Sequence, residues 1–293
     1  MALQDSTVLV TGATGNIGSV VVQLLAETDV SVRAMTRNPE SVDLGENQNV
    51  EVVKGDFMVP ETLDSALQGV EKAFLLSPNV ENMAEMQSNF VTAAERADLT
   101  HLVKLSAAGA DPDTSWDIAR WHGRIEEEIE ASDIEYTFVR PVSYMQNLLD
   151  DAATIRSQGV FARATPADAK INVVDTRDVA RLVTHALRDE GHRGQVYKPT
   201  GPEPITFGAM AAALTEATGR QVEFEELTPA EAKQSILNEG NPEWLADAMV
   251  GLQVAFGNGI ADLNTDHITQ VTGEPPGSFT EFAHDHTETF TPN

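Results

Sequence analysis

The chain has 293 residues, 41% of them hydrophobic, which is enough for one large α/β domain or for a domain with a smaller second lobe. Its 46 Asp and Glu against 19 Lys and Arg give a formal net charge of -27. This argues against nucleic acid or an anionic membrane as a partner, because both need a basic surface. The absence of cysteine excludes disulfides, thiolate catalysis and cysteine-bound metal.

The acidic residues are spread along the whole chain rather than gathered in one run. Such a surface suits a salt-rich cytoplasm, where screening reduces self-repulsion. We therefore expect a halophilic source, and the alternative is a moderately acidic mesophilic enzyme. No segment combines a basic start with a long apolar run, so a cytoplasmic location is expected.

Residues 8–18 predict a strand, a tight turn and the start of a helix. Apolar residues run directly into glycines at 12, 15 and 18, and an apolar helical pattern begins at Val20. Gly12 lets the turn close, Gly15 lets the backbone approach a pyrophosphate, and Gly18 lets the helix pack close to the strand. The N–H groups at the helix start would hold the phosphates. The stretch predicts dinucleotide binding, with a plain structural turn as the alternative.

The second predicted strand, 30–36, bears on the choice of cofactor. An acidic residue at its end would bind the ribose hydroxyls of NAD, but the chain has Thr36 and Arg37 there. An arginine fits the 2′-phosphate of NADP, and no carboxylate is present to repel it. The sequence therefore predicts NADP(H), and an exposed surface arginine is the alternative.

Two further strand ends are expected at the ligand, because the carboxyl ends of the strands face it in a doubly wound sheet. The strand 50–56 ends in Gly-Asp, so Asp56 and Phe57 would flank the adenine. Asp56 suits the cap of a turn equally well. The strand 72–77 ends at Ser77, which would border the nicotinamide side.

Strand and helix patterns alternate as far as Pro141. A helix is predicted over 83–97, a strand over 99–105, a helix over 118–131 and a strand over 134–140. By the right-handed crossover rule this alternation gives a parallel sheet covered on both faces, so the fold class is a Rossmann-type doubly wound α/β sheet. The glutamates at 126–128 and 130 are predicted to form a solvated helix face.

The regularity weakens after Pro141. The further elements predicted are a helix start over 143–149, a short strand over 171–175, a helix from 178, strands over 195–199 and 221–225, and helices over 207–218, 229–238 and 244–256. We expect an NADP-binding domain at 1–150. Residues 151–293 would supply the remaining sheet elements and a small, mainly helical substrate lobe that caps the cleft. The last residues, with His284 and His286, are expected at the surface or frayed, and no metal site is predicted.

Five stretches resemble one known family. They are Thr-Gly-Ala-Thr-Gly-Asn-Ile-Gly (11–18), Arg-Ala-Met-Thr-Arg-Asn-Pro (33–39), Gly-Asp-Phe (55–57), Trp-His-Gly-Arg-Ile-Glu (121–126) and Tyr-Thr-Phe-Val-Arg-Pro-Val-Ser-Tyr-Met-Gln-Asn (136–147). They are similar to the NmrA-like group of atypical short-chain dehydrogenases/reductases. That group includes NAD(P)H:quinone oxidoreductases and non-catalytic NADP-sensing regulators. The similarity extends to about residue 260.

The resemblance implies roles for individual residues. It places at the cofactor Gly12, Thr14, Gly15, Asn16 and Ile17 (pyrophosphate), Arg37 (2′-phosphate), Asp56 and Phe57 (adenine), and Leu76 and Ser77 (nicotinamide ribose). It places Tyr144, Met145 and Asn147 on the substrate side.

The departure from the family pattern concerns the proton donor. A typical short-chain dehydrogenase has a tyrosine followed four residues later by a lysine on the helix expected at 118–131, and these positions are Ile118 and His122 here. Ketone reduction by the phenolate route is therefore not expected. His122 is a candidate to replace the lysine at the ribose or to relay a proton, although a structural role beside Trp121 also suits it. Ser106, after the fifth strand, is expected either to bond substrate or cofactor or to cap a loop.

The predicted function is hydride transfer from NADPH to a quinone or another small conjugated carbonyl. Such an acceptor is electrophilic and solvent can protonate its oxygen, so the protein must mainly stack and orient the two rings. The alternative is a non-catalytic NADP(H) sensor with a protein partner, which the missing tyrosine favours. A sugar-nucleotide epimerase is less well supported, because its chemistry needs the same tyrosine and lysine.

Overall fold

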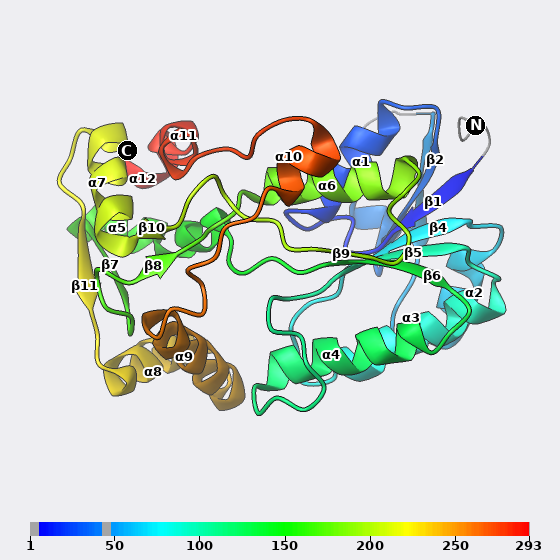
Figure 1. Ribbon diagram of the computed structural model, residues 1–293, viewed down its shortest axis with the longest axis horizontal. Coiled ribbons are helices and arrows are strands. Elements are labelled where there is room, and N and C mark those ends of the chain that lie inside the picture. The colour runs from blue at the N-terminus through cyan, green and yellow to red at the C-terminus, as the bar shows by residue number, and fades with distance from the viewer. Residues whose placement is uncertain (1–5, 43–47, 293) are drawn as a thin grey trace. The chain divides into compact units, whose positions relative to one another are not determined.

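The fold is that of a computed structural model, which describes residues 6–42 and 48–292 (Figure 1). The chain forms two compact units. Unit 1 comprises Met1–Pro141 and Arg177–Lys198, and unit 2 comprises Val142–Thr176 and Pro199–Asn293. The chain therefore leaves unit 1 after Pro141 and returns to it for one helix and one strand.

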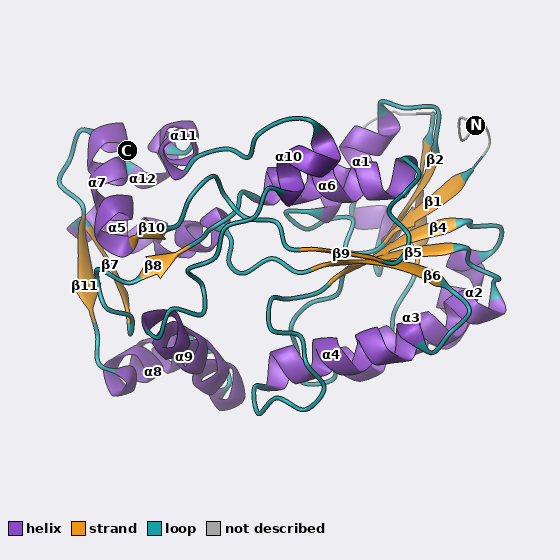
Figure 2. Ribbon diagram, viewed as in Figure 1, coloured by secondary structure: helices purple, strands orange, loops and turns teal. Residues whose placement is uncertain are grey.

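Unit 1 is built on a seven-stranded parallel sheet in the order β3-β2-β1-β4-β5-β6-β9 (Figure 2). Its strands are β1 (Thr7–Val10), β2 (Ser31–Thr36), β3 (Val50–Lys54), β4 (Lys72–Leu75), β5 (His101–Leu105), β6 (Glu135–Val139) and β9 (Gln195–Tyr197). The strand order reverses between β1 and β4, and doubly wound folds bind ligands at the carboxyl end of such a reversal. The predicted Rossmann-type α/β class is confirmed.

Helices cover both faces of this sheet, α1 and α6 on one and α2, α3 and α4 on the other (Figure 2). The helices of unit 1 are α1 (Gly18–Ala26), the 3-10 turn η1 (Pro39–Ser41), α2 (Pro60–Leu67), α3 (Met83–Arg96), α4 (Asp117–Glu130) and α6 (Thr176–Arg188). The patterns over 83–97 and 118–131 predicted α3 and α4 to within a residue or two. Helix α2 was not predicted from the sequence, because its eight residues carry only a short apolar stripe.

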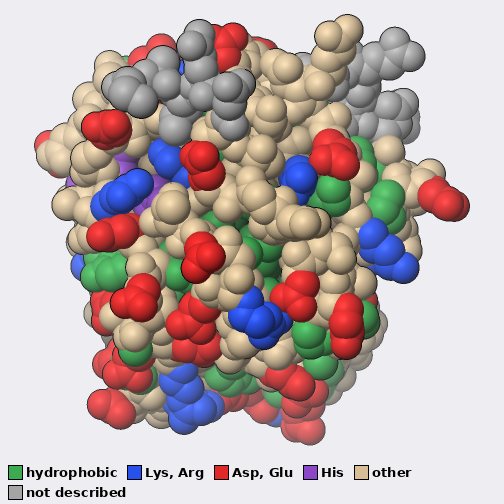
Figure 3. All heavy atoms as spheres, turned by 90° about the vertical axis from the view of Figure 1, so that its right-hand side faces the viewer, with side chains coloured by type: hydrophobic (Ala, Val, Ile, Leu, Met, Phe, Trp, Pro, Cys, Tyr) green, Lys and Arg blue, Asp and Glu red, His purple; other side chains and the backbone are tan. Residues whose placement is uncertain are grey.

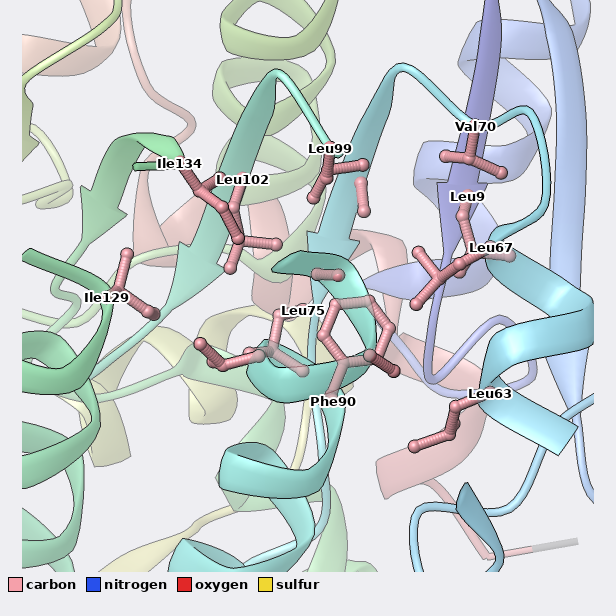
Figure 4. Packing of buried hydrophobic residues seen from close by; sticks show 14 of the residues in the cluster. Leu9, Leu63, Leu67, Val70, Leu75, Phe90, Leu99, Leu102, Ile129 and Ile134 are labelled. Carbon is pink, nitrogen blue, oxygen red and sulfur yellow. The ribbon is translucent and has the colours of Figure 1, made fainter. Parts of the chain in front are cut away.

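A layer of hydrophobic side chains joins the sheet to α2, α3 and α4 (Figure 4). Leu75 and Leu102 come from the sheet, and Phe90 and Ile129 come from the helices that cover this face. Each fully buried side chain of this kind stabilises the fold by about 1.5–3 kcal/mol. Side chains two residues apart on a strand point to the same face of the sheet, so Lys104 points to the same helix-covered face as Leu102.

Unit 2 combines helices with two short two-stranded sheets, β7 with β11 and β8 with β10. Its elements are η2 (Met145–Asp151), α5 (Ala152–Gln158), β7 (Val160–Arg163), β8 (Lys170–Ile171), β10 (Ile205–Thr206), α7 (Phe207–Thr218), β11 (Glu223–Glu226), α8 (Pro229–Asn238), α9 (Glu243–Gly257), α10 (His267–Thr272), α11 (Phe279–Asp285) and α12 (Thr287–Phe290). The expectation of a frayed end is wrong, because Phe282 and Phe290 lie in the core of this unit. His284 is exposed, as expected.

Within the described ranges, no helix has the length and apolarity needed to cross a membrane. On the face drawn in Figure 3, acidic side chains are scattered among fewer basic ones.

A salt requirement follows from this surface if the source is halophilic. In dilute buffer the -27 charge is unscreened, and its self-repulsion opposes the compact state. We expect the near-UV circular dichroism of the folded protein to be lost on dialysis from molar salt into dilute buffer. A sharp thermal transition that persists in dilute buffer would contradict this expectation.

Candidate functional site

The turn between β1 and α1 is built by glycines that have no room for a side chain. Gly12 has a φ of +60°, and a Cβ there would lie 2.9 Å from Cγ of Leu76. A Cβ on Gly18 would lie 2.2 Å from the carbonyl oxygen of Gly12. The N–H of Gly15 donates to that same oxygen at 3.0 Å and closes the turn. Helix α1 is thereby held close to the end of β1.

The start of α1 offers backbone N–H groups to an anion. Ile17 occupies the N-cap and has no side-chain acceptor to satisfy them. Thr14, Gly15 and Asn16, which precede it, are exposed. The N–H of Gly15 is bonded within the turn, so it is the backbone N–H groups of its exposed neighbours, with the positive end of the helix dipole, that suit a pyrophosphate.

The arginine predicted at the 2′-phosphate is exposed just after β2. Arg37 differs in this from Arg33 on the same strand, whose guanidinium bonds Glu51 at 3.2 Å and the carbonyl of Gln68 at 2.6 Å. The side chain of Arg37 is therefore exposed where that of Arg33 is bound within the protein.

The two residues predicted at the adenine have structural partners. The Oδ1 of Asp56 accepts from the N–H of Met58 at 2.9 Å, so this carboxylate caps a turn, as the alternative interpretation held. The ring of Phe57 is buried in the core and packs edge-on against Phe90, with 6.0 Å between centroids. The ring of Phe57 is therefore part of the hydrophobic core.

Ser77, just after β4, forms a polar pair with Gln87 on α3. Leu76 is tied to the end of β1, because its N–H donates to Oγ1 of Thr11 at 2.8 Å. Nε2 of Gln87, on α3, donates to Oγ of Ser77 at 2.8 Å. The Oε1 atom of Gln87 is buried without a hydrogen-bond donor among the described residues. Gln87 was not predicted, since one glutamine in an amphipathic helix gives no signal.

Lys104 and His122 form the second polar pair. Nζ of Lys104, on β5, lies 2.8 Å from Nδ1 of His122, on α4. Lys104 is fully buried and His122 is 6% exposed. Gly123 fixes this part of α4, because a Cβ there would lie 2.4 Å from the backbone of Asp111. Lys104 was not predicted, although a lysine in a mostly apolar central strand is a signal that could have found it.

Burial depresses the basicity of both groups. It lowers the pKa of Lys104 to about 7, an effect that the carboxylate of Glu126 opposes and the charge of Arg140 reinforces. It also holds the pKa of His122 well below its usual value, with further lowering by Lys104 and Arg140. The imidazole is therefore neutral throughout the neutral pH range.

Glu126 contradicts the predicted solvated face of α4. Its side chain is 4% exposed and is paired with Arg140 through both carboxylate oxygens, including Nε to Oε1 at 3.0 Å. Glu127 and Glu130 are exposed, as predicted. Glu126 lies one helical turn from His122, so the helical period brings the two to the same inward face.

Ser106 lies just beyond β5 on the same side as Lys104. Its backbone N–H donates to the carbonyl of Val139 at 2.7 Å, but its buried hydroxyl has no partner within the described part of the chain. Buried hydroxyls normally have partners, so this one is available to a ligand. Ile118, where the tyrosine of a typical short-chain dehydrogenase would stand, is only partly buried.

The residues predicted on the substrate side belong to unit 2. Met145 is buried in its core, Asn147 is exposed, and burial raises the pKa of the Tyr144 phenol. A pocket of about 60 Å³ lies beside Met145 and Phe279.

Three features define a dinucleotide-binding protein of the Rossmann class. They are the glycine turn, the reversal of strand order between β1 and β4, and the polar groups at the ends of β4 and β5. The chain belongs to the NmrA-like family, whose model matches residues 4–273.

Individual relatives cover nearly the whole chain. Over 283 residues it is 37% identical to the NAD(P)H azoreductase of Xenophilus azovorans, covering 97% of this chain and 99% of that one. It is 36% identical over 291 residues to the (4-alkanoyl-5-oxo-2,5-dihydrofuran-3-yl)methyl phosphate reductase of Streptomyces griseus, covering 97% and 99%. The crystal structure of the Escherichia coli NADPH-dependent quinone oxidoreductase QOR2 with NADPH superposes with a TM-score of 0.84 at 29% identity, covering 95% and 99%. These relatives confirm the family that the motifs indicated.

Proposed function

We propose that the protein is an NADPH-dependent reductase that transfers a hydride to a quinone or another small conjugated carbonyl. The observation that carries this proposal is a glycine turn fit for a dinucleotide beside buried polar groups at the ends of β4 and β5, with Ile118 in place of a phenol. An acceptor that solvent can protonate needs no such phenol. The relatives named for quinone and azo reduction support the same class of acceptor.

The small residues and exposed backbone of the turn support binding of the cofactor at this place. The N–H groups that precede Gly18 would hold the pyrophosphate, and Arg37 would pair with the 2′-phosphate. The orphaned atoms of Gln87 and Ser106 would find partners near the nicotinamide end, where His122 offers a ring nitrogen. Bound NADPH supplies the hydride. The protein supplies position and hydrogen bonds.

The test is NADPH oxidation, followed by its absorbance, with a panel of quinones, enones and azo compounds. We expect turnover with quinones or enones. Measurable NADPH binding without turnover across the panel would reject the reductase. It would favour the non-catalytic sensor, which should bind NADP+ and NADPH with different affinities.

Arg37→Ser is expected to weaken NADPH binding by about ten- to a hundredfold, the value of a lost charged hydrogen bond. NADH has no 2′-phosphate, so its affinity should not change, and calorimetry with both cofactors measures the difference. Arg124→Ser, at an exposed position on α4, is the matched control and should bind both cofactors normally. Equal losses for NADPH and NADH would show that Arg37 does not meet the 2′-phosphate.

A further inference from the structure

We propose that Lys104 is a positioning residue that holds the His122 imidazole with its proton on Nε2, and that the charge of Lys104 sets how strongly this proton is donated. The inference rests on the proposed function, in which His122 faces cofactor or substrate.

The hydrogen bond between the two residues decides the tautomer. Nζ of Lys104 and Nδ1 of His122 are 2.8 Å apart. A charged amine has three N–H donors and no lone pair, so the lysine donates and Nδ1 accepts. An accepting nitrogen carries no proton, and the proton of the neutral ring is therefore on Nε2.

A structural role alone does not account for this lysine. Lys104 has no solvent-accessible surface, so folding carries the full cost of removing its amine from water. Among the described residues its other hydrogen-bond partner is the carbonyl oxygen of Leu105, at the long distance of 3.4 Å. An apolar side chain would fill the same space without that cost. Lys72, on the neighbouring strand, has a structural role instead, since its amine donates to the Leu187 carbonyl at 2.6 Å.

The charges around the pair assign its ionisation to the lysine. The groups that act on the amine are His122 and Glu126 from α4 and Arg140 from the end of β6. Burial, reinforced by Arg140 and opposed by Glu126, leaves Lys104 with a pKa of about 7, whereas the pKa of His122 lies well below its usual value. A change near neutral pH at this site therefore reports the lysine and not the histidine.

Loss of the lysine proton weakens the arrangement. Below pH 7 the ammonium can only donate, so it fixes the tautomer and polarises the ring toward donation from Nε2. A neutral amine both donates and accepts, so the tautomer with the proton on Nδ1 becomes accessible. The rate of NADPH-dependent reduction is expected to fall as the pH rises through about 7.

Nitrogen-15 NMR of the histidine-labelled full chain tests the tautomer without any substrate. His122→Phe assigns the signal. In the wild type we expect the Nε2–H form of a neutral ring below pH 7 and a shift of that signal as the pH rises through 7. Lys104→Met should release the tautomer preference, and Lys72→Met, the same change at another buried lysine, should not. A proton on Nδ1 in the wild type, or no shift with pH, would overturn the proposal, and neither result depends on whether a Lys104 variant folds.

Kinetics add a second readout. Lys104→Met is expected to lower kcat about tenfold or more, because the Nε2–H hydrogen-bond donor of His122 is no longer held in place. Lys104→Arg keeps a charged donor that does not titrate, so it should retain the tautomer and lose the step near pH 7. A step that persists in Lys104→Arg would overturn the assignment. If the wild type reduces none of the acceptors, the proposed function fails while the NMR result still decides the role of Lys104.

Discussion

Gly18→Ala is expected to destabilise the protein by about 1–3 kcal/mol or more, the usual cost of forcing atoms into a packed interior. The added Cβ would lie 2.2 Å from the carbonyl oxygen of Gly12, a distance that a real Cβ essentially never shows. This neighbour is backbone and cannot rotate away, so α1 must move from the end of β1. Thermal and urea unfolding measure the loss, and NADPH binding should fail together with the turn.

Gly15→Ala is expected to lower NADPH affinity while leaving the stability of the fold nearly unchanged. A Cβ there would meet only the Gly12 carbonyl oxygen, at 3.4 Å, so the protein should unfold at nearly the wild-type temperature. The methyl group would stand where the backbone approaches the pyrophosphate, and we expect NADPH affinity to fall about tenfold. Gly208→Ala, with its nearest neighbour at 3.8 Å, is the control for both measurements. Wild-type NADPH affinity in Gly15→Ala would show that the phosphates bind elsewhere.

Glu126→Gln is expected to cost about 3 kcal/mol in the free energy of unfolding. The carboxylate is 4% exposed and Arg140 is 24% exposed, so the value belongs at the low end for breaking a buried ion pair. The substitution leaves the charge of Arg140 without its partner. It also removes the carboxylate that opposes the lowering of the Lys104 pKa. Urea unfolding at neutral pH measures the difference.

Glu127→Gln is the matched control, because the neighbouring glutamate of the same helix is exposed. It should change the free energy of unfolding by no more than about 0.5 kcal/mol. The double variant Glu126→Leu/Arg140→Leu removes both charges and should recover much of the stability. Equal stabilities of Glu126→Gln and Glu127→Gln would contradict the importance of the ion pair.

The sequence by itself determined the fold class and the place of the dinucleotide turn. A strand that passes directly into a helix needs glycine where φ is positive or where backbones touch, as at Gly12 and Gly18. These constraints act within a few residues, so a short stretch of the sequence is enough to show them. The alternation of strands and helices up to Pro141 is local in the same way, and it dictates a parallel sheet.

Only the tertiary structure decided which polar residues form the interior of the site. Lys104, His122 and Arg140 come from β5, α4 and the end of β6, and their burial depends on packing between segments far apart in the sequence. Glu126 carries the same local signature as the exposed Glu127 beside it. Whether a carboxylate is solvated or forms an ion pair depends on the residue that packs opposite it. That residue is determined by how the sheet and helices assemble.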